Sequence, residues 1–146
     1  MADAKNVSFD SIMQDLKDRK FFPVYYLMGD ESYYIDRISD YIAEHVLQPE
    51  ERDFNQTILF GSDVNASQIA DAARRYPMMS EYQVLIVKEA QNIKNTEALE
   101  KYIKAPMNST ILVMCLKNAK IDGRKKEMVK NIQAAGVLFE SNKLKD

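Results

Sequence analysis

The stretch VYYLMGDESYYID, residues 24–36, decides the fold of this chain. Its first five residues are apolar or aromatic, and such a short run predicts a buried β-strand. Gly29 and Asp30 then turn the chain, and apolar residues at helical spacing follow at once, which predicts a long helix. A strand, a glycine turn and a helix are the frame in which mononucleotide-binding domains hold a phosphate group.

The same stretch lacks the chemistry of a phosphate site. A functional loop reads G-x-x-x-x-G-K-[ST], and counting from Gly29 places Tyr34, Ile35 and Asp36 at its last three positions. Tyr34 blocks close approach of the backbone to a phosphate, and Ile35 removes the cation. Asp36 cannot replace the metal-binding hydroxyl and repels phosphate. We therefore expect a degenerate site that binds neither ATP nor ADP, and we expect no cofactor.

Predicted strands and helices alternate along the rest of the chain, which is typical of a parallel sheet joined by helical crossovers. We expect an α/β fold with three layers, in which helices cover both faces of about five strands. Pro49 is expected to end the second helix. The predicted helices lie at 8–19, after Gly29, after Asn65, at 95–104 and at 122–134, and the strands at 24–28, 54–60, 82–87, 110–116 and 137–139.

Composition limits the classes of function. The 146 residues are 46% hydrophobic and 29% charged with a net charge of −2, which fits one globular domain and argues against binding nucleic acid over the whole surface. The single cysteine, Cys115, lies in an apolar run and is expected to be buried. No stretch approaches the ~20 apolar residues of a membrane span, and residues 1–5 lack a secretion signal. We expect no membrane contact and a cytoplasmic protein.

The sequence shows no grouping of residues that is typical of a catalytic or metal-binding site. The only histidine, His45, falls near a helix end, where a helix-end cation or a partly packed side chain is expected. Histidines and cysteines do not cluster, so no metal site is expected. The third strand is followed by Lys88 and Glu89, a cation where an ATPase of this layout would place a metal-coordinating acid. A generic α/β domain also carries a glycine after its first strand, so the pattern alone leaves a relation to ATPases open.

A basic segment at residues 117–130 is one candidate binding surface. Its candidate phosphate contacts are Lys120, Arg124, Lys125 and Lys126. Acidic residues interrupt this segment, so a solvated helix face is the simpler explanation. Phosphate contacts alone weaken steeply with salt, and we expect little sequence-specific DNA binding.

The connection between the third helix and the third strand is another candidate surface. It contains Tyr76, Pro77, Met78 and Met79. Pro77 favours an extended chain, in which neighbouring side chains point in opposite directions. Both methionines therefore cannot easily enter the core, and surface methionines make adaptable apolar contacts. The alternative interpretation is one core methionine and one half-exposed methionine.

Two phrases carry a resemblance to a known family. The opening PVYYLMGDESYYID, residues 23–36, and the phrase YQVLIVKEA, residues 82–90, resemble the N-terminal domain of the bacterial DNA polymerase III delta subunit, a component of the sliding-clamp loader. The resemblance covers residues 8–140. It implies a P-loop NTPase (AAA+)-like fold with a degenerate nucleotide site. It also implies a clamp-binding domain at 1–140, and a linker at 141–146 leading to domains absent from this chain.

The resemblance implies a function without catalysis by this subunit. Such a protein binds and helps open the sliding clamp (the beta subunit) during DNA replication, within a holoenzyme that is a DNA-directed DNA polymerase and nucleotidyltransferase. Its clamp-binding element maps to Met78 and Met79, with Tyr76 and Pro77 beside them; some relatives carry Leu-Phe there. The other loader subunits, gamma/tau and delta prime, are expected to bind mainly through the absent domains. The chain is expected to bind DNA weakly or only within the complex.

Alternatives to this function are a nucleic-acid-binding α/β domain using residues 117–130 and an enzyme with an unrecognised substrate. The expected geometry separates the two candidate regions near residues 29 and 78. Helix-to-strand connections lie at the amino edge of a parallel sheet, whereas phosphate loops lie at the carboxyl edge. The methionine pair and the degenerate nucleotide site are therefore expected at opposite edges.

Overall fold

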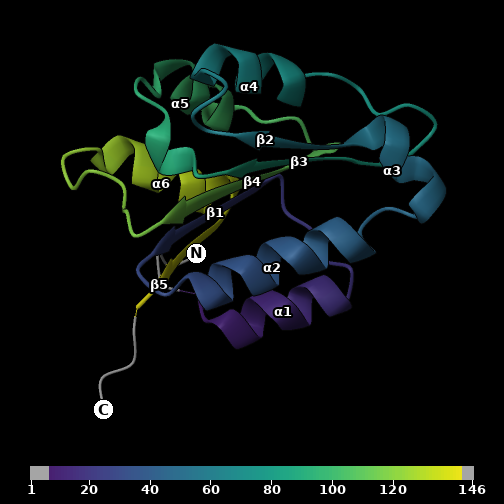
Figure 1. Ribbon diagram of the computed structural model, residues 1–146, viewed down its shortest axis with the longest axis horizontal. Coiled ribbons are helices and arrows are strands. Elements are labelled where there is room, and N and C mark those ends of the chain that lie inside the picture. Colours follow the sequence, from purple (N-terminus) through teal and green to yellow (C-terminus); the bar gives the residue numbers. More distant parts are fainter. Residues whose placement is uncertain (1–6, 143–146) are drawn as a thin grey trace.

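Five parallel strands form a single sheet covered by helices on both faces in a computed structural model, which describes residues 7–142 (Figure 1). The spatial order β2-β3-β4-β1-β5 places the first strand near one edge of the sheet, between the two strands that come last in the chain. This architecture confirms the predicted α/β fold. The strands are β1 (Val24–Gly29), β2 (Gln56–Phe60), β3 (Gln83–Lys88), β4 (Thr110–Lys117) and β5 (Gly136–Ser141).

The helices divide between the two faces of the sheet and enclose two apolar cores (Figure 1). Alternate residues of β1 feed opposite cores: Tyr25 and Leu27 pack under the first two helices, and Tyr26 and Met28 face the others. One face carries α1 (Phe9–Lys17) and α2 (Ser32–His45), and the other carries α4 (Ala66–Ala73), α5 (Glu97–Lys104) and α6 (Lys126–Ala135), with a 3₁₀ turn at Ala90–Asn92.

Side chains cap the starts of two of the predicted helices. The hydroxyl of Ser8 accepts the amide N–H of Ser11 at 3.0 Å. Asn65 and Gln68 form a reciprocal capping box, with side-chain to backbone distances of 2.9 and 2.8 Å. The helices α1 and α4 thus begin where the sequence predicts helices, directly after Ser8 and Asn65.

One helix was not anticipated, α3 (Pro49–Asn55). The second helix ends before Pro49, as expected, but Pro49 itself begins a further helix, and the expectation that the second strand begins at residue 54 is wrong. Proline is favoured at the first position of a helix, where its missing N–H costs nothing. The carboxylate of Glu51 also accepts the amide N–H of Gln48 at 2.8 Å, which stabilises this start. The second strand therefore begins only at Gln56.

The last strand also runs further than residues 137–139. It includes Ser141, which is buried, so the first residue of the expected linker belongs to the sheet. Residues 143–146 of that linker lie outside the described part of the chain. Cys115 is buried as expected. Among residues 7–142, no helix combines the length and the apolar character that crossing a membrane requires.

Candidate functional site

At the carboxyl edge of the sheet, the loop after β1 uses its backbone polar groups within the protein. The amide of Gly29 donates to the carbonyl of Ala119 at 3.0 Å, and the amide of Asn118 donates to the carbonyl of Gly29 at 2.8 Å. The amide of Asp30 donates to the carbonyl of Ser141 at 3.0 Å. A phosphate loop needs free N–H groups aimed at its ligand. The N–H groups of residues 29 and 30 already have protein acceptors.

Gly29 is required here by a close approach of the last strand. Its φ of +124° lies in a region that other residues rarely adopt, and a Cβ atom would lie 1.9 Å from the carbonyl oxygen of Ser141. The hydroxyl of Ser141 donates to the carbonyl of Glu31 at 2.7 Å. The glycine that resembled part of a phosphate loop therefore makes room for β5.

The three replaced loop positions each have a structural role in α2. The Tyr34 ring packs on Phe9 with 4.9 Å between ring centroids, and Ile35 is fully buried in the core. Asp36 forms an ion pair with Lys117, 2.8 Å from its Nζ. Rebuilding a phosphate site here would therefore disturb the core as well as the loop. The expected failure to bind ATP or ADP stays a prediction.

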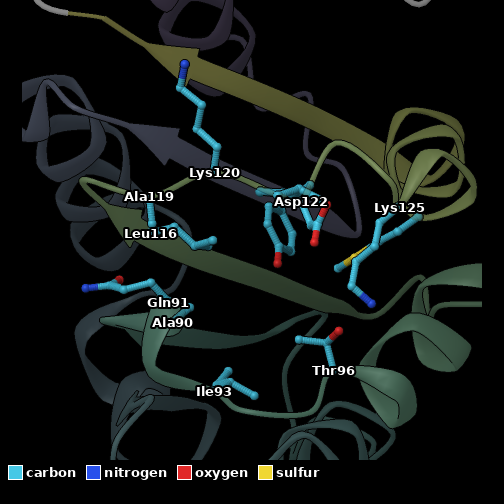
Figure 2. Close-up of a pocket in the computed structure, with 12 residues that line it drawn as sticks. Ala90, Gln91, Ile93, Thr96, Leu116, Ala119, Lys120, Asp122 and Lys125 are labelled. Atoms are coloured by element: carbon cyan, nitrogen blue, oxygen red, sulfur yellow. The ribbon is translucent and has the colours of Figure 1, made fainter.

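A small pocket of about 160 Å³ also lies at the carboxyl edge (Figure 2). Two lysines border it, but they do not converge: Lys120 points away from the pocket, whereas Lys125 extends toward Thr96. Lys120 pairs with Glu140 at 2.5 Å, and Lys125 pairs with Glu100 at 2.9 Å. Both cations are already matched by carboxylates, so the pocket does not offer a phosphate two free positive charges.

The charges around this pocket perturb one another. Burial of Glu100 raises its pKa, but hydrogen bonds from Thr96 and Lys125 and the charges of Lys125 and Lys104 together lower it. The hydrogen bond to Glu140 raises the pKa of Lys120. These pKa shifts come from ion pairs between neighbouring side chains on the protein surface.

The rest of the basic segment is only partly free. The guanidinium of Arg124 donates to Asp122 at 2.8 Å and lowers the pKa of that carboxyl group. Lys126 is exposed at the first residue of α6, and no ion pair joins it to another described residue. The structure therefore does not gather the four candidate phosphate contacts into one unpaired patch.

Histidine and metal-binding candidates give no further site in the described part of the chain. The imidazole of His45, the last residue of α2, stacks on the ring of Tyr41 with 4.1 Å between centroids. Between residues 7 and 142, no three side chains of the His, Cys, Asp and Glu types are grouped so that they could hold a metal ion.

The amino edge of the sheet presents the methionine pair to solvent. Met78 is 63% exposed and Met79 is 100% exposed, with Tyr76 exposed beside them and Pro77 half-buried. The alternative of one core methionine is therefore wrong. The physical reason is the backbone of Met79, whose φ of +55° is left-handed, so the chain does not continue in the extended form that sends neighbours to opposite sides.

The two regions lie at opposite edges, as the topology predicted. The register pairs Gln83, the first residue of β3, with Thr110, and pairs Gly29, the last residue of β1, with Lys117. The connection from α4 to β3 therefore enters the sheet at one edge, and the loop after β1 leaves it at the other (Figure 1).

Two functional candidates on α3 escaped sequence analysis. The buried amide of Asn55 accepts the N–H of Met78 at 2.6 Å and donates to the carbonyl of Met78 at 3.0 Å. Phe54, its neighbour, is 71% exposed. Pro49 and the glutamates that follow it could have signalled the start of this helix. The contact between Asn55 and Met78, 23 residues away, leaves no trace in sequence periodicity. A largely apolar groove of about 350 Å³ is lined by Glu50, Glu51, Phe54, Asn55, Met78 and Met79.

Known proteins resemble this chain in sequence and in structure. The family described as "DNA polymerase III, delta subunit" matches residues 25–142. The DNA polymerase III subunit delta of Bacillus subtilis is 29% identical over 143 residues, which span 91% of this chain and 41% of that protein. This chain therefore spans about two fifths of the length of that relative.

Solved structures agree with the sequence match. The Bacillus subtilis DNA clamp loader delta protein superimposes with a TM-score of 0.82 at 28% identity, covering 94% of this chain and 43% of that one. A gamma subunit-related protein of DNA polymerase III from Thermotoga maritima gives a TM-score of 0.53 at 13% identity, over 95% of this chain and 47% of that one. The second match shows a shared fold alone.

Proposed function

Because this chain belongs to the DNA polymerase III delta subunit family, we propose that it binds the sliding clamp during DNA replication and helps to open it. In this proposal the clamp-binding domain extends through Ser141, the last residue of β5, and the residues after it lead to further domains. The other loader subunits, gamma/tau and delta prime, bind mainly through those domains. The protein works in the cytoplasm, within the DNA polymerase III holoenzyme.

The observation that carries the proposal is the exposure of two neighbouring methionines at the amino edge of the sheet. Met79 has no part of its side chain buried, and Met78 is mostly exposed. Burying a methionine side chain is worth about 1.5–3 kcal/mol, so the pair can contribute much of the energy of a protein contact. Exposed apolar clusters of this kind mark interaction sites, and Tyr76 and Pro77 extend the same surface.

The subunit itself acts without catalysis in this proposal. Support comes from the loop after β1, whose N–H groups bond to protein carbonyls, and from Lys88 at the end of β3. Nucleotide hydrolysis then falls to other subunits of the loader, and this subunit contributes binding energy to the clamp. No cofactor takes part in the proposed role.

Calorimetric titration of the chain with the sliding clamp of the same organism tests the proposal. We expect saturable binding by the wild-type chain. The double variant Met78→Ala/Met79→Ala should bind roughly a hundredfold more weakly, with an unchanged melting temperature because both side chains are exposed. Clamp affinity equal to wild type in a folded double variant would remove the assignment of this surface.

DNA binding by the basic segment is the second function to test in the same series. The feature that favours it is a pair of exposed lysines on α6, Lys126 and Lys130. Their neighbours are largely held in ion pairs. We propose weak DNA contact, or contact only within the complex, and expect any binding of the isolated chain to duplex DNA to disappear at physiological salt.

A further inference from the structure

We propose that helix α3 is the second half of the clamp-docking surface: Asn55 holds the methionine turn in its binding shape, and Phe54 adds a third apolar contact. This inference rests on the proposed clamp binding and deepens it. It assigns roles to two residues that lie 23 or more positions before the methionine pair and that meet it only in the folded chain.

The first step is the double hydrogen bond between Asn55 and Met78. One side-chain amide both accepts the N–H of Met78 and donates to its carbonyl, at 2.6 and 3.0 Å. The same Nδ2 also donates to the carbonyl of Glu51 at 3.1 Å, one helical turn back. Asn55 is 4% exposed, so these bonds are shielded from competition by water. A buried amide thus ties the backbone of the turn to α3.

The second step is the backbone that this tie supports. Met79 follows at once, with a left-handed φ of +55° that non-glycine residues seldom adopt unless the surroundings impose it. The start of the same loop is also fixed, because the Gln83 side chain donates to the carbonyls of Ala72 at 3.0 Å and Arg75 at 2.8 Å. The turn that exposes both methionines is therefore anchored on both sides.

The third step is the apolar surface of α3 itself. Phe54 is 71% exposed and lines the same groove as Met78 and Met79. An aromatic side chain on a helix has few rotamers, so it loses little entropy when a partner covers it. The helix is fixed in place by Arg52, whose guanidinium donates to the carbonyl of Glu44 at the end of α2. A partner that buries the two methionines would therefore meet Phe54 on a rigid support.

The occupant of this groove is the clamp, because the groove is continuous with the proposed methionine contact. A partner pocket that accepts the two methionines would press against Phe54 at the same time. If α3 served only to stabilise the fold, Phe54 would have no reason to be exposed beside the turn, and loss of the Asn55 bonds would act on stability alone.

The variant Phe54→Ala tests the apolar contact. We expect clamp affinity to fall about tenfold, with the melting temperature unchanged because the side chain is mostly exposed. The matched control is Tyr33→Ala, an exposed aromatic residue of α2 at the opposite edge. It should leave clamp affinity at the wild-type value. Equal affinities for Phe54→Ala and wild type would overturn the role of Phe54.

The variant Asn55→Ala tests the positioning role. Freeing the turn adds an ordering cost to binding, so we expect clamp affinity to fall about three- to tenfold at a temperature where the variant is fully folded. Hydrogen exchange at the Met78 amide should become faster. The control Asn65→Ala removes another asparagine that bonds to backbone, at the start of α4, and should lower stability without changing either readout.

The outcomes separate this inference from the proposed function. If Met78→Ala/Met79→Ala loses clamp affinity while Phe54→Ala and Asn55→Ala bind like wild type, the α3 inference is wrong and the proposed function stands. If Asn55→Ala and Asn65→Ala behave alike in both readouts, Asn55 is only structural. If the wild-type chain does not bind the clamp, the proposed function and the α3 inference fail together.

Discussion

The two edges of the same sheet differ in where their chemical groups find partners. At the carboxyl edge, backbone amides, a glycine and several cations are matched by other groups of the chain. At the amino edge, the side chains of Met78 and Met79 are exposed to solvent, although hydrogen bonds from Asn55 hold the backbone of their turn. The difference illustrates that function resides in the sites that a fold carries and not in the fold.

The contrast also has an energetic side. At the carboxyl edge, internal hydrogen bonds satisfy backbone polar groups that would otherwise need water or a ligand. Leaving Met78 and Met79 in water forgoes the stability that their burial would give. We infer that the amino edge is kept open for a partner, and the following variants test that inference.

The largest effect is expected where the carboxyl edge is forced back toward a phosphate site. Ile35→Lys restores the cation of a phosphate loop, but it places a charge in a fully buried position without an opposite charge. We expect the free energy of unfolding to fall by at least about 4 kcal/mol, measured by chemical denaturation. No nucleotide binding should accompany the loss.

The control for this variant is Tyr33→Lys, two residues earlier on the exposed side of α2. It should change stability by less than about 0.5 kcal/mol. A stable Ile35→Lys protein that binds ATP would show that the carboxyl edge is still a latent nucleotide site, and the contrast between the edges would then be broken.

The second largest effect is expected at the amino edge, on binding and not on folding. Met79→Asp places a carboxylate where the clamp would supply an apolar pocket, and desolvating it opposes binding. We expect clamp affinity to fall by more than roughly a hundredfold, measured by calorimetry. The melting temperature should stay at the wild-type value, because Met79 is 100% exposed in the free chain.

The smallest effect is expected for the ion pair between Glu100 and Lys125, and it tests whether charged groups at the carboxyl edge are paired within the protein. Burial raises the pKa of Glu100, but hydrogen bonds from Thr96 and Lys125 and the charges of Lys125 and Lys104 together lower it below its ordinary value of 4.5. Its contribution to stability is therefore present above pH 4.5 and is lost as the pH falls through the pKa of the folded state. In Glu100→Gln, the free energy of unfolding should fall less on acidification than in wild type, by a difference of less than about 1 kcal/mol. Denaturation at pH 7 and at successively lower pH measures this difference.

A dependence of stability on pH that is equally steep in wild type and Glu100→Gln would contradict the pairing with Lys125. In that case the basic segment would be freer to contact phosphate than the ion pairs suggest.

Sequence reasoning reached the fold because local signals and topology agree. Strands with continuous apolar residues, such as 110–116, and capped helices, such as the one after Asn65, predicted the layers and the two edges. The failures were local and physical. Proline can start a helix as well as end one, and Pro49 starts α3. Ser141 belongs to the sheet through backbone hydrogen bonds, which the residue type does not predict.

The candidate site was predicted only in part for the same reason. Met78 and Met79 stood out because a proline precedes them and an extended chain cannot bury both. Their joint exposure depends on a left-handed residue, which sequence patterns do not show for methionine. Asn55 and Phe54 act through a contact between distant segments, and such contacts require the folded chain.

Methionine methyl resonances offer the most direct test of the contrast between the edges. With 13C-methyl methionine in the chain, Met78 and Met79 report on the amino edge, while Met28 near the end of β1 reports on the carboxyl edge. On addition of the sliding clamp, we predict that the signals of Met78 and Met79 shift or broaden and that the signal of Met28 keeps its position. Clamp binding that moves Met28 and leaves Met78 and Met79 unchanged would contradict the account.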